Sequence, residues 1–252
     1  MRYFITLAFK GTNYFGWQIQ PDAISVQEVL NKALSTVLRS DITVVGAGRT
    51  DAGVHATKMV AHFDLEVDLR DDVKLSHKLN SYLPDDIVVS SIERVKEDAH
   101  ARFDAERRAY DFCVILGRNP FKLETTWQLY NTDLDVAQMN LACKELLKHK
   151  DFKCFSRSKT DVKTFDCLIF DAYWTASENE LIFHIEANRF LRNMVRAIVG
   201  TMIDVGTGKK SLEEFKEIIL SRDRSKAGKS APSTGLFLSE IIYPPSIVYE
   251  DR

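Results

Sequence analysis

Alternating polar and apolar residues at positions 2–9 predict a β-strand, with Tyr3 and every second residue up to Phe9 on one face. Apolar residues then follow at helical spacing over 26–38, behind a capping box that begins at Ser25. The other elements expected in this half are strands at 42–48, 58–67 and 86–95 and a short helix at 72–82.

The second half of the chain repeats this pattern. The expected strands cover 107–116, 167–174, 180–187 and 235–243, and the expected helices cover 135–149, 188–208 and 211–220. Apart from one extra helix, both halves follow the order β-α-β-β-α-β, which is that of ferredoxin-like domains. We therefore predict an α+β protein made of two ferredoxin-like halves, residues 1–104 and 105–252, whose antiparallel sheets join around a central cleft.

Composition is that of a globular protein that stays in solution, since 45% of the 252 residues are hydrophobic and 28% are charged. No apolar run reaches the roughly 18 residues of a membrane helix, and the N-terminus does not resemble a signal peptide. The four cysteines form no CxxC pair and have no metal-type spacing. We expect reduced thiols, no bound metal and a cytoplasmic location.

Charge is distributed unevenly along the chain. The formal net charge is only −2, so the protein as a whole is not a basic nucleic-acid binder. Residues 186–230 nevertheless hold ten Lys and Arg against six Asp and Glu. Such a local patch can attract a phosphate backbone, although a solvated basic face remains the alternative on charge alone.

The stretch GAGRTDAGVHA, residues 46–56, combines small residues with an acid and a base. It is not a dinucleotide fingerprint, because Asp51 stands where the third glycine is required. In an extended loop Arg49 and Asp51 would project to the same side, and the guanidinium would favour an ionised carboxylate suited to nucleophilic or electrostatic work. The alternative is a turn-capping Asp with a salt-bridged Arg. His55 is better explained as a buried, hydrogen-bonded histidine.

Two further groups of basic residues stand out. Arg189, Arg192 and Arg196 have the spacing of one stripe on the long helix, which could hold phosphates or be a solvated face. A second group surrounds the strand with Tyr110, an arrangement that suits RNA bases stacking on aromatic rings. Its members are Arg102, Arg107 and Arg108. Tyr110 could equally be a half-buried strand residue.

Taken together, these stretches make the chain resemble the TruA family of tRNA pseudouridine synthases from end to end. The motifs that carry the resemblance are FKGTNYFGWQ (9–18), SVQ (25–27), AGRTDAGVHA (47–56), LPDDI (83–87), HARFDA (100–105), NRFLRNMVR (188–196) and GLFL (235–238).

The resemblance implies an enzyme that converts uridine to pseudouridine, typically at positions 38–40 of the tRNA anticodon stem-loop. It also implies a homodimer without cofactor or metal, in which one tRNA contacts both subunits. The family's catalytic aspartate matches Asp51, its strand tyrosine matches Tyr110, and its two active-site basic residues match Arg49 and Arg192. The expected RNA contacts of the cleft are Arg102, Arg107, Arg108, Arg189, Arg196, Lys209 and Lys210.

The sequence leaves the chemical route open. Asp51 could attack C1′ of the sugar or C6 of the base, or remove a sugar proton, and each route requires the uridine to be flipped out. Small neighbouring residues would make room for it, and Tyr110 would stack on the base or take the C5 proton. The chain departs from the family pattern at Cys167, Asp111 and Phe112. A non-catalytic RNA-binding protein is the main rival, and a glycosidase, which normally needs two carboxylates, is the second.

Overall fold

The computed structural model describes residues 1–69, 71–130, 132–158 and 162–249. The chain contacts divide it into two compact units. One comprises Met1–Arg107 together with the described chain from Phe237 onward, and the other comprises Arg108–Leu236. This division assigns most of the last strand, which we expected in the second half, to the first unit.

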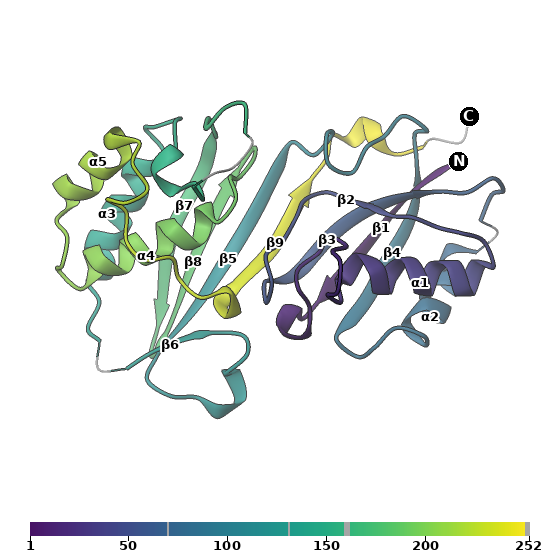
Figure 1. Ribbon diagram of the computed structural model, residues 1–252, viewed down its shortest axis with the longest axis horizontal. Coiled ribbons are helices and arrows are strands. Elements are labelled where there is room, and N and C mark those ends of the chain that lie inside the picture. Colours follow the sequence, from purple (N-terminus) through teal and green to yellow (C-terminus); the bar gives the residue numbers. More distant parts are fainter. Residues whose placement is uncertain (70, 131, 159–161, 250–252) are drawn as a thin grey trace. The chain divides into compact units, whose positions relative to one another are not determined.

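The first unit is built on an antiparallel arrangement in which β1 lies between β3 and β4 (Figure 1). Its elements are β1 (Arg2–Phe9), α1 (Val26–Leu38), β2 (Val45–Gly46), β3 (His55–Asp64), α2 (Asp72–Asn80) and β4 (Ile87–Val95), with β9 (Leu236–Ile242) pairing parallel to the start of β3. The face of β1 predicted from the alternation is buried. The Ser25 hydroxyl accepts from the Glu28 N–H at 3.3 Å, so the predicted cap of α1 is present.

One predicted strand of this unit is much shorter than expected. Of residues 42–48, only Val45–Gly46 pair with β3. The reason is that side chains of α1 take the backbone groups just before it: the Ile42 N–H donates to Ser35 Oγ at 2.9 Å, and the Val44 N–H donates to Asn31 Oδ1 at 3.0 Å. Backbone groups satisfied by a helix in this way have no need of a ladder partner.

The second unit contains an antiparallel run of three strands, with β8 between β5 and β7, and helices packed on it (Figure 1). Its elements are β5 (Arg107–Leu116), β6 (Trp127–Leu129), α3 (Val136–Leu146), β7 (Ile169–Ser177), β8 (Glu180–Ala187), α4 (Met194–Gly206) and α5 (Leu212–Ser221). The side chains of Phe112, Phe183 and Phe215 are fully buried in it. Helix α3 packs on β7, α4 and α5, so these elements share the core.

The long helix predicted from residue 188 begins only at Met194, so the expected stripe of three arginines on it is wrong. Asn188 instead continues the strand pairing, because its N–H donates to the Leu168 carbonyl at 3.0 Å. Asn193 then adopts a left-handed conformation with φ of 65°, which a helix interior does not allow and which Asn tolerates better than most residues. Arg196 is therefore the only member of the stripe on α4.

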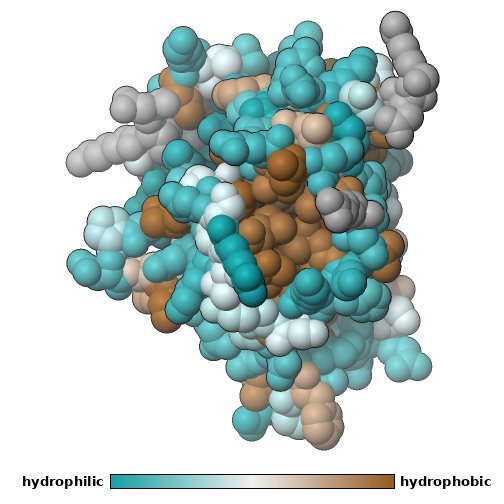
Figure 2. All heavy atoms as spheres, turned by 90° about the vertical axis from the view of Figure 1, so that its right-hand side faces the viewer, coloured by the Kyte–Doolittle hydropathy of each residue, from teal (hydrophilic) through white to brown (hydrophobic). Residues whose placement is uncertain are grey.

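The first unit exposes an apolar area to solvent. In the view from the right-hand side of Figure 1, an apolar area is surrounded by hydrophilic side chains (Figure 2). Large exposed apolar residues of this unit include Val67, Val73 and Phe103. Within the described ranges, no helix is long and apolar enough to cross a membrane.

All four cysteines are free thiols, as expected. Burial raises the pKa of the Cys143 and Cys154 thiols to about 12, and that of the Cys113 and Cys167 thiols to about 11. They are therefore protonated at neutral pH, which makes them poor nucleophiles and poor metal ligands.

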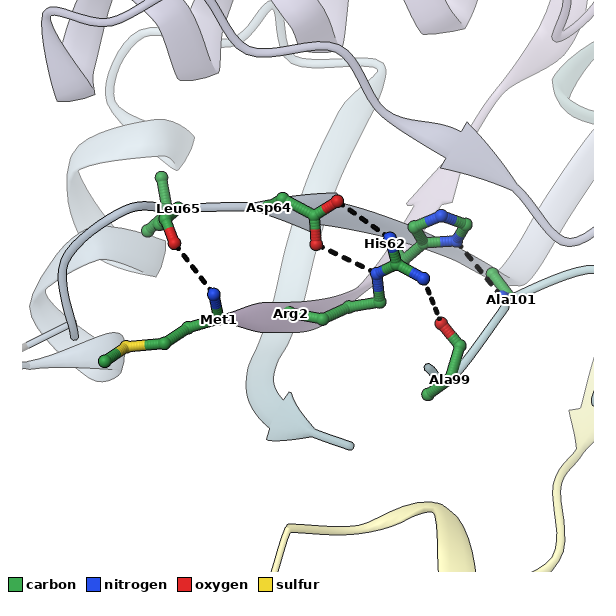
Figure 3. Close-up of polar contacts among 7 residues, drawn as sticks. All are labelled: Met1, Arg2, His62, Asp64, Leu65, Ala99 and Ala101. Atoms are coloured by element: carbon green, nitrogen blue, oxygen red, sulfur yellow. Dashed lines mark hydrogen bonds and ion pairs between the residues drawn. The ribbon is translucent and has the colours of Figure 1, made fainter. Parts of the chain in front are cut away.

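A buried histidine fastens β3 to the loop that follows β4. The His62 ring accepts a hydrogen bond at Nδ1 from the Ala101 N–H at 3.1 Å, while Arg2 joins Asp64 to the Ala99 carbonyl (Figure 3). Burial, helped by the nearby positive charge of Arg2, lowers the pKa of His62 to about 4. The ring is therefore neutral in the folded protein at pH 7.

We predict that His62 makes the protein less stable in acid. Between pH 6.5 and 4 the unfolded chain binds a proton at this histidine that the folded protein does not, so the free energy of unfolding falls as pH falls through that window. His62→Gln, which keeps an acceptor for Ala101, should flatten the decline of Tm between pH 7 and 4.5. The exposed His77→Gln serves as control, and equal slopes in all three proteins would contradict the assignment.

Candidate active site

The loop that connects β2 to β3 carries the two charged residues singled out in the sequence. The Asp51 carbonyl accepts from the Val54 N–H at 3.2 Å, closing a turn that contains Gly53 with φ of 75°. The Asp51 residue is half-buried and Arg49 is exposed. Arg49 Nε donates to Gln18 Oε1 at 2.9 Å, which ties this side chain to residues 10–18.

A second segment, residues 10–18, clasps this loop through backbone contacts. The Gly53 N–H donates to the Tyr14 carbonyl at 3.2 Å, and the Trp17 N–H approaches the Thr50 carbonyl at 3.4 Å. Gly16 has φ of 89°, and a Cβ there would lie 2.2 Å from the Thr50 oxygen. The close approach of the two backbones therefore requires glycine at this position.

The clasp is itself anchored to the start of β4. Tyr14 donates its hydroxyl to Asp86 Oδ1 at 2.5 Å, and Asn13 Nδ2 donates to Asp86 Oδ2 at 3.0 Å. The Asp86 carbonyl accepts from the Lys10 N–H at 2.9 Å. Burial and the Asp86 carboxylate raise the pKa of the Tyr14 hydroxyl, so it stays a donor. The LPDDI and FKGTNYFGWQ motifs thus act together.

His55 has the structural role that we expected. The residue is buried, with 1% of its surface exposed, and its Nδ1 accepts from the Gly11 N–H at 2.9 Å. Its ring stacks on Phe237 with centroids 4.6 Å apart. A Cβ at Gly11 would lie 2.0 Å from the Val54 oxygen, so this glycine also allows close approach of the clasp.

Gln27 of the SVQ motif connects three of the segments that hold the loop. From α1, its Nε2 donates to the Val44 carbonyl at 2.8 Å and its Oε1 accepts from the Ile19 N–H at 3.1 Å. The strand into the loop and the residue that follows the clasp are therefore joined through one side chain that is only 8% exposed. The sequence pattern gave no sign of these two contacts of Gln27.

The glycines of the loop have different reasons to be small. A Cβ at Gly46 would lie 2.4 Å from the Trp17 indole nitrogen, so this position is small for internal packing. Gly53 is required for its positive φ. At Gly48, by contrast, a Cβ would meet nothing within 4 Å. Gly48 therefore borders open space.

In the second unit, Tyr110 lies on β5 beside the loop that leads into α4. Its half-buried ring contacts Phe190 edge-on, with centroids 5.1 Å apart, and Arg108 Nη1 donates to the Asn188 carbonyl at 2.9 Å. The same loop carries Arg192, which is exposed and whose carbonyl accepts from the Arg157 N–H at 3.0 Å. The start of β5 and the loop that carries Arg192 are thus neighbours.

The three departures from the family pattern have local explanations. Asp111 on β5 pairs at 2.7 Å with His184, which lies directly opposite on β8, and raises the pKa of that imidazole. Phe112 is fully buried and packs edge-on against Trp127. Cys167 is buried, and its N–H donates to the Lys150 carbonyl at 2.8 Å. All three serve the interior or the sheet of the second unit, and the Asp111–His184 pair was not foreseen from the sequence.

Comparison with known proteins decides the family. A family model described as tRNA pseudouridine synthase matches residues 5–104 and 142–244. The chain belongs to this family. A tRNA pseudouridine synthase A from Bacteroides thetaiotaomicron is 53% identical over 253 residues, covering 99% of this chain and 93% of the relative. Similar proteins of the same name come from Bacteroides fragilis, at 53% identity with 98% of both chains covered, and Thermoanaerobacter pseudethanolicus, at 41% identity with 95% and 98% covered.

The match of this synthase to the family model includes Arg49, Asp51 and Arg192 but leaves out residues 105–141, where Tyr110 lies. The active-site role of Tyr110 therefore stays a prediction from the resemblance alone. Among the described residues, no group of three His, Cys, Asp or Glu side chains could hold a metal ion.

The expected RNA-contact residues of the synthase differ in exposure. Arg102, Arg107 and Lys209 are exposed, whereas Arg108, Arg189, Arg196 and Lys210 are half-buried. Arg196 Nε donates to the Ala231 carbonyl at 2.7 Å, so this side chain also anchors the 222–231 loop. Within that loop Arg222 pairs with Asp151 at 2.8 Å, and Arg224 bonds the Gly228 carbonyl and Ser230 Oγ. Several of these arginines therefore also stabilise the local structure.

We predict opposite behaviour for two alanine substitutions in the loop. Gly46→Ala should lower the free energy of unfolding by about 1–3 kcal/mol, because the new methyl overlaps the Trp17 indole. Gly48→Ala should leave stability nearly unchanged. Urea unfolding of both variants checks this, and a Gly48→Ala variant as unstable as Gly46→Ala would contradict the assignment of open space at Gly48.

Proposed function

We propose that this family member isomerises uridine to pseudouridine in the anticodon stem-loop of tRNA, at positions 38–40, with Asp51 as the catalytic group. The observation that carries the proposal is the position of Asp51. It lies in the AGRTDAGVHA loop, which is held by the clasp of residues 10–18, within the part of the chain that matches the family model. A half-buried acid on a braced loop is suited to act on a nucleotide placed against it.

The proposed reaction leaves the atomic composition of the nucleotide unchanged. The bond between N1 of uracil and C1′ of ribose breaks, the base turns, and a bond forms between C5 and C1′. The C5 proton leaves and N1 gains a proton from solvent, with no net transfer of electrons. An ionised Asp51 could attack C1′ or C6 or remove a sugar proton, and each route requires the base to be out of the stack.

We further propose that the two units are ferredoxin-like halves that both contribute to tRNA binding. In support, the first unit has its strands in the order β4-β1-β3-β2 with antiparallel neighbours. By resemblance, Arg49 and Arg192 are the basic residues of the active site, and Tyr110 would face the base. By resemblance, the enzyme acts as a homodimer in the cytoplasm without a cofactor.

Unmodified tRNA carrying tritium at C5 of uracil provides the test. An isomerase releases tritium to water in step with pseudouridine formation. Release of free uracil would indicate a glycosidase instead, and tRNA binding with neither product would indicate a non-catalytic RNA-binding protein.

In the same assay, we predict that Asp51→Asn abolishes tritium release while tRNA affinity and Tm stay near those of the wild type. The amide has nearly the same shape as the carboxylate but cannot act as nucleophile or base. Substantial remaining turnover would exclude Asp51 as the catalytic group.

We predict that Tyr110→Phe binds tRNA normally but releases tritium slowly, because the ring still contacts Phe190 while the hydroxyl that would take the C5 proton is gone. Tyr110→Ala should also lose stacking, about 1–3 kcal/mol of binding free energy. Full activity of the Phe variant would rule out proton transfer by this residue. The measurements are tritium release at saturating tRNA and the Kd of each variant.

A further inference from the structure

The turn of the HARFDA motif presents an aromatic ring to solvent. The Phe103 residue is 74% exposed, although Phe is among the residues most often found in the interior. The turn around it is closed by local hydrogen bonds: the His100 N–H donates to Asp104 Oδ2 at 2.6 Å, and the Asp104 N–H donates to the His100 carbonyl at 3.1 Å. The ring is therefore carried by an ordered backbone.

This turn is also fastened to the core of the first unit. Figure 3 shows two of the bonds, from the Ala101 N–H to His62 and from Arg2 to the Ala99 carbonyl. In addition, the Tyr243 hydroxyl donates to the Ala101 carbonyl at 2.6 Å. Three different elements, β1, β3 and the end of the chain after β9, thus fix the base of the turn.

Two histidine rings connect Phe103 to the interior of the first unit. The His62 and His100 rings lie edge to face with centroids 4.6 Å apart, and the His100 and Phe103 rings have centroids 4.3 Å apart. The exposed ring is thus the outer end of a row of three contacting rings that begins with the buried His62. Next to it, the Arg102 guanidinium carbon lies 5.8 Å from the centre of the Phe103 ring.

Such a ring costs little conformational entropy when it binds a flat partner, because the turn is already ordered. Every nucleobase has a π-face that can stack on an aromatic side chain, and a neighbouring guanidinium adds a contact for phosphate. An apolar protein surface would instead have to desolvate Arg102 and Asp104 on either side of the ring. The surroundings therefore favour a base over a protein partner.

We propose that Phe103 is a stacking platform for an unpaired base of the bound tRNA, with Arg102 contacting the adjoining phosphate. The inference rests on the proposed function, since it adds a subsite to the same tRNA complex. It concerns binding rather than chemistry, so its test can be separated from the test of catalysis.

The experiment measures the Kd of an unmodified tRNA transcript for four variants of the whole protein. Phe103→Ala should weaken binding by roughly 5- to 100-fold, the range expected for loss of one stacked base. Phe103→Tyr should bind as the wild type does, whereas Phe103→Leu, which keeps apolar area without a π-face, should resemble the Ala variant. Phe121→Ala is the matched control, because Phe121 is 96% exposed in the second unit and should bind normally.

Wild-type affinity in Phe103→Ala would overturn the proposal. Full affinity in Phe103→Leu would overturn it too, since apolar contact alone would then suffice. Sedimentation without tRNA gives a third check: dissociation of a wild-type dimer by Phe103→Ala would assign the ring to a contact with a second copy. If tRNA binding depends on Phe103 but the wild type releases no tritium, the platform holds and the proposed isomerisation fails.

Discussion

The hydrogen bond from the Gly53 N–H to the Tyr14 carbonyl is the constraint on which the rest of the site depends. It joins the turn after Asp51 to a segment nearly forty positions earlier in the chain. With side-chain bulk at Gly16 or Gly11, the two backbones could not approach each other so closely. The turn that carries the acid is thus placed by main-chain contacts.

Several of the motifs shared with the family help to hold the same loop in place. Asp86 anchors the clasp, Gln27 joins the clasp to the strand that enters the loop, and His55 holds the other end of the loop. None of these three side chains needs to touch a substrate for its type to matter. Buried polar groups of this kind must keep their partners, so replacing one would leave another unsatisfied.

Sequence pattern alone predicted β1, the cap of α1 and the structural role of His55, because each depends on neighbouring residues or on a single buried face. The resemblance to the family suggested Asp51 as the catalytic residue, whereas the hydrophobic periodicity could not have distinguished it from a residue that caps a turn. The short β2 and the late start of α4 were missed. The first depends on α1 side chains that bond a distant backbone, and the second on the left-handed conformation of Asn193. Neither leaves a periodic signal.

Amide hydrogen exchange in the protein without RNA most directly tests whether the loop is held before the substrate arrives. The account predicts that the N–H groups of Gly11 and Gly53 exchange slowly, at rates comparable to those in β3, and that adding tRNA changes them little. Fast exchange at both positions in the free protein, with protection only after tRNA is added, would show that the RNA orders the loop and would contradict the account.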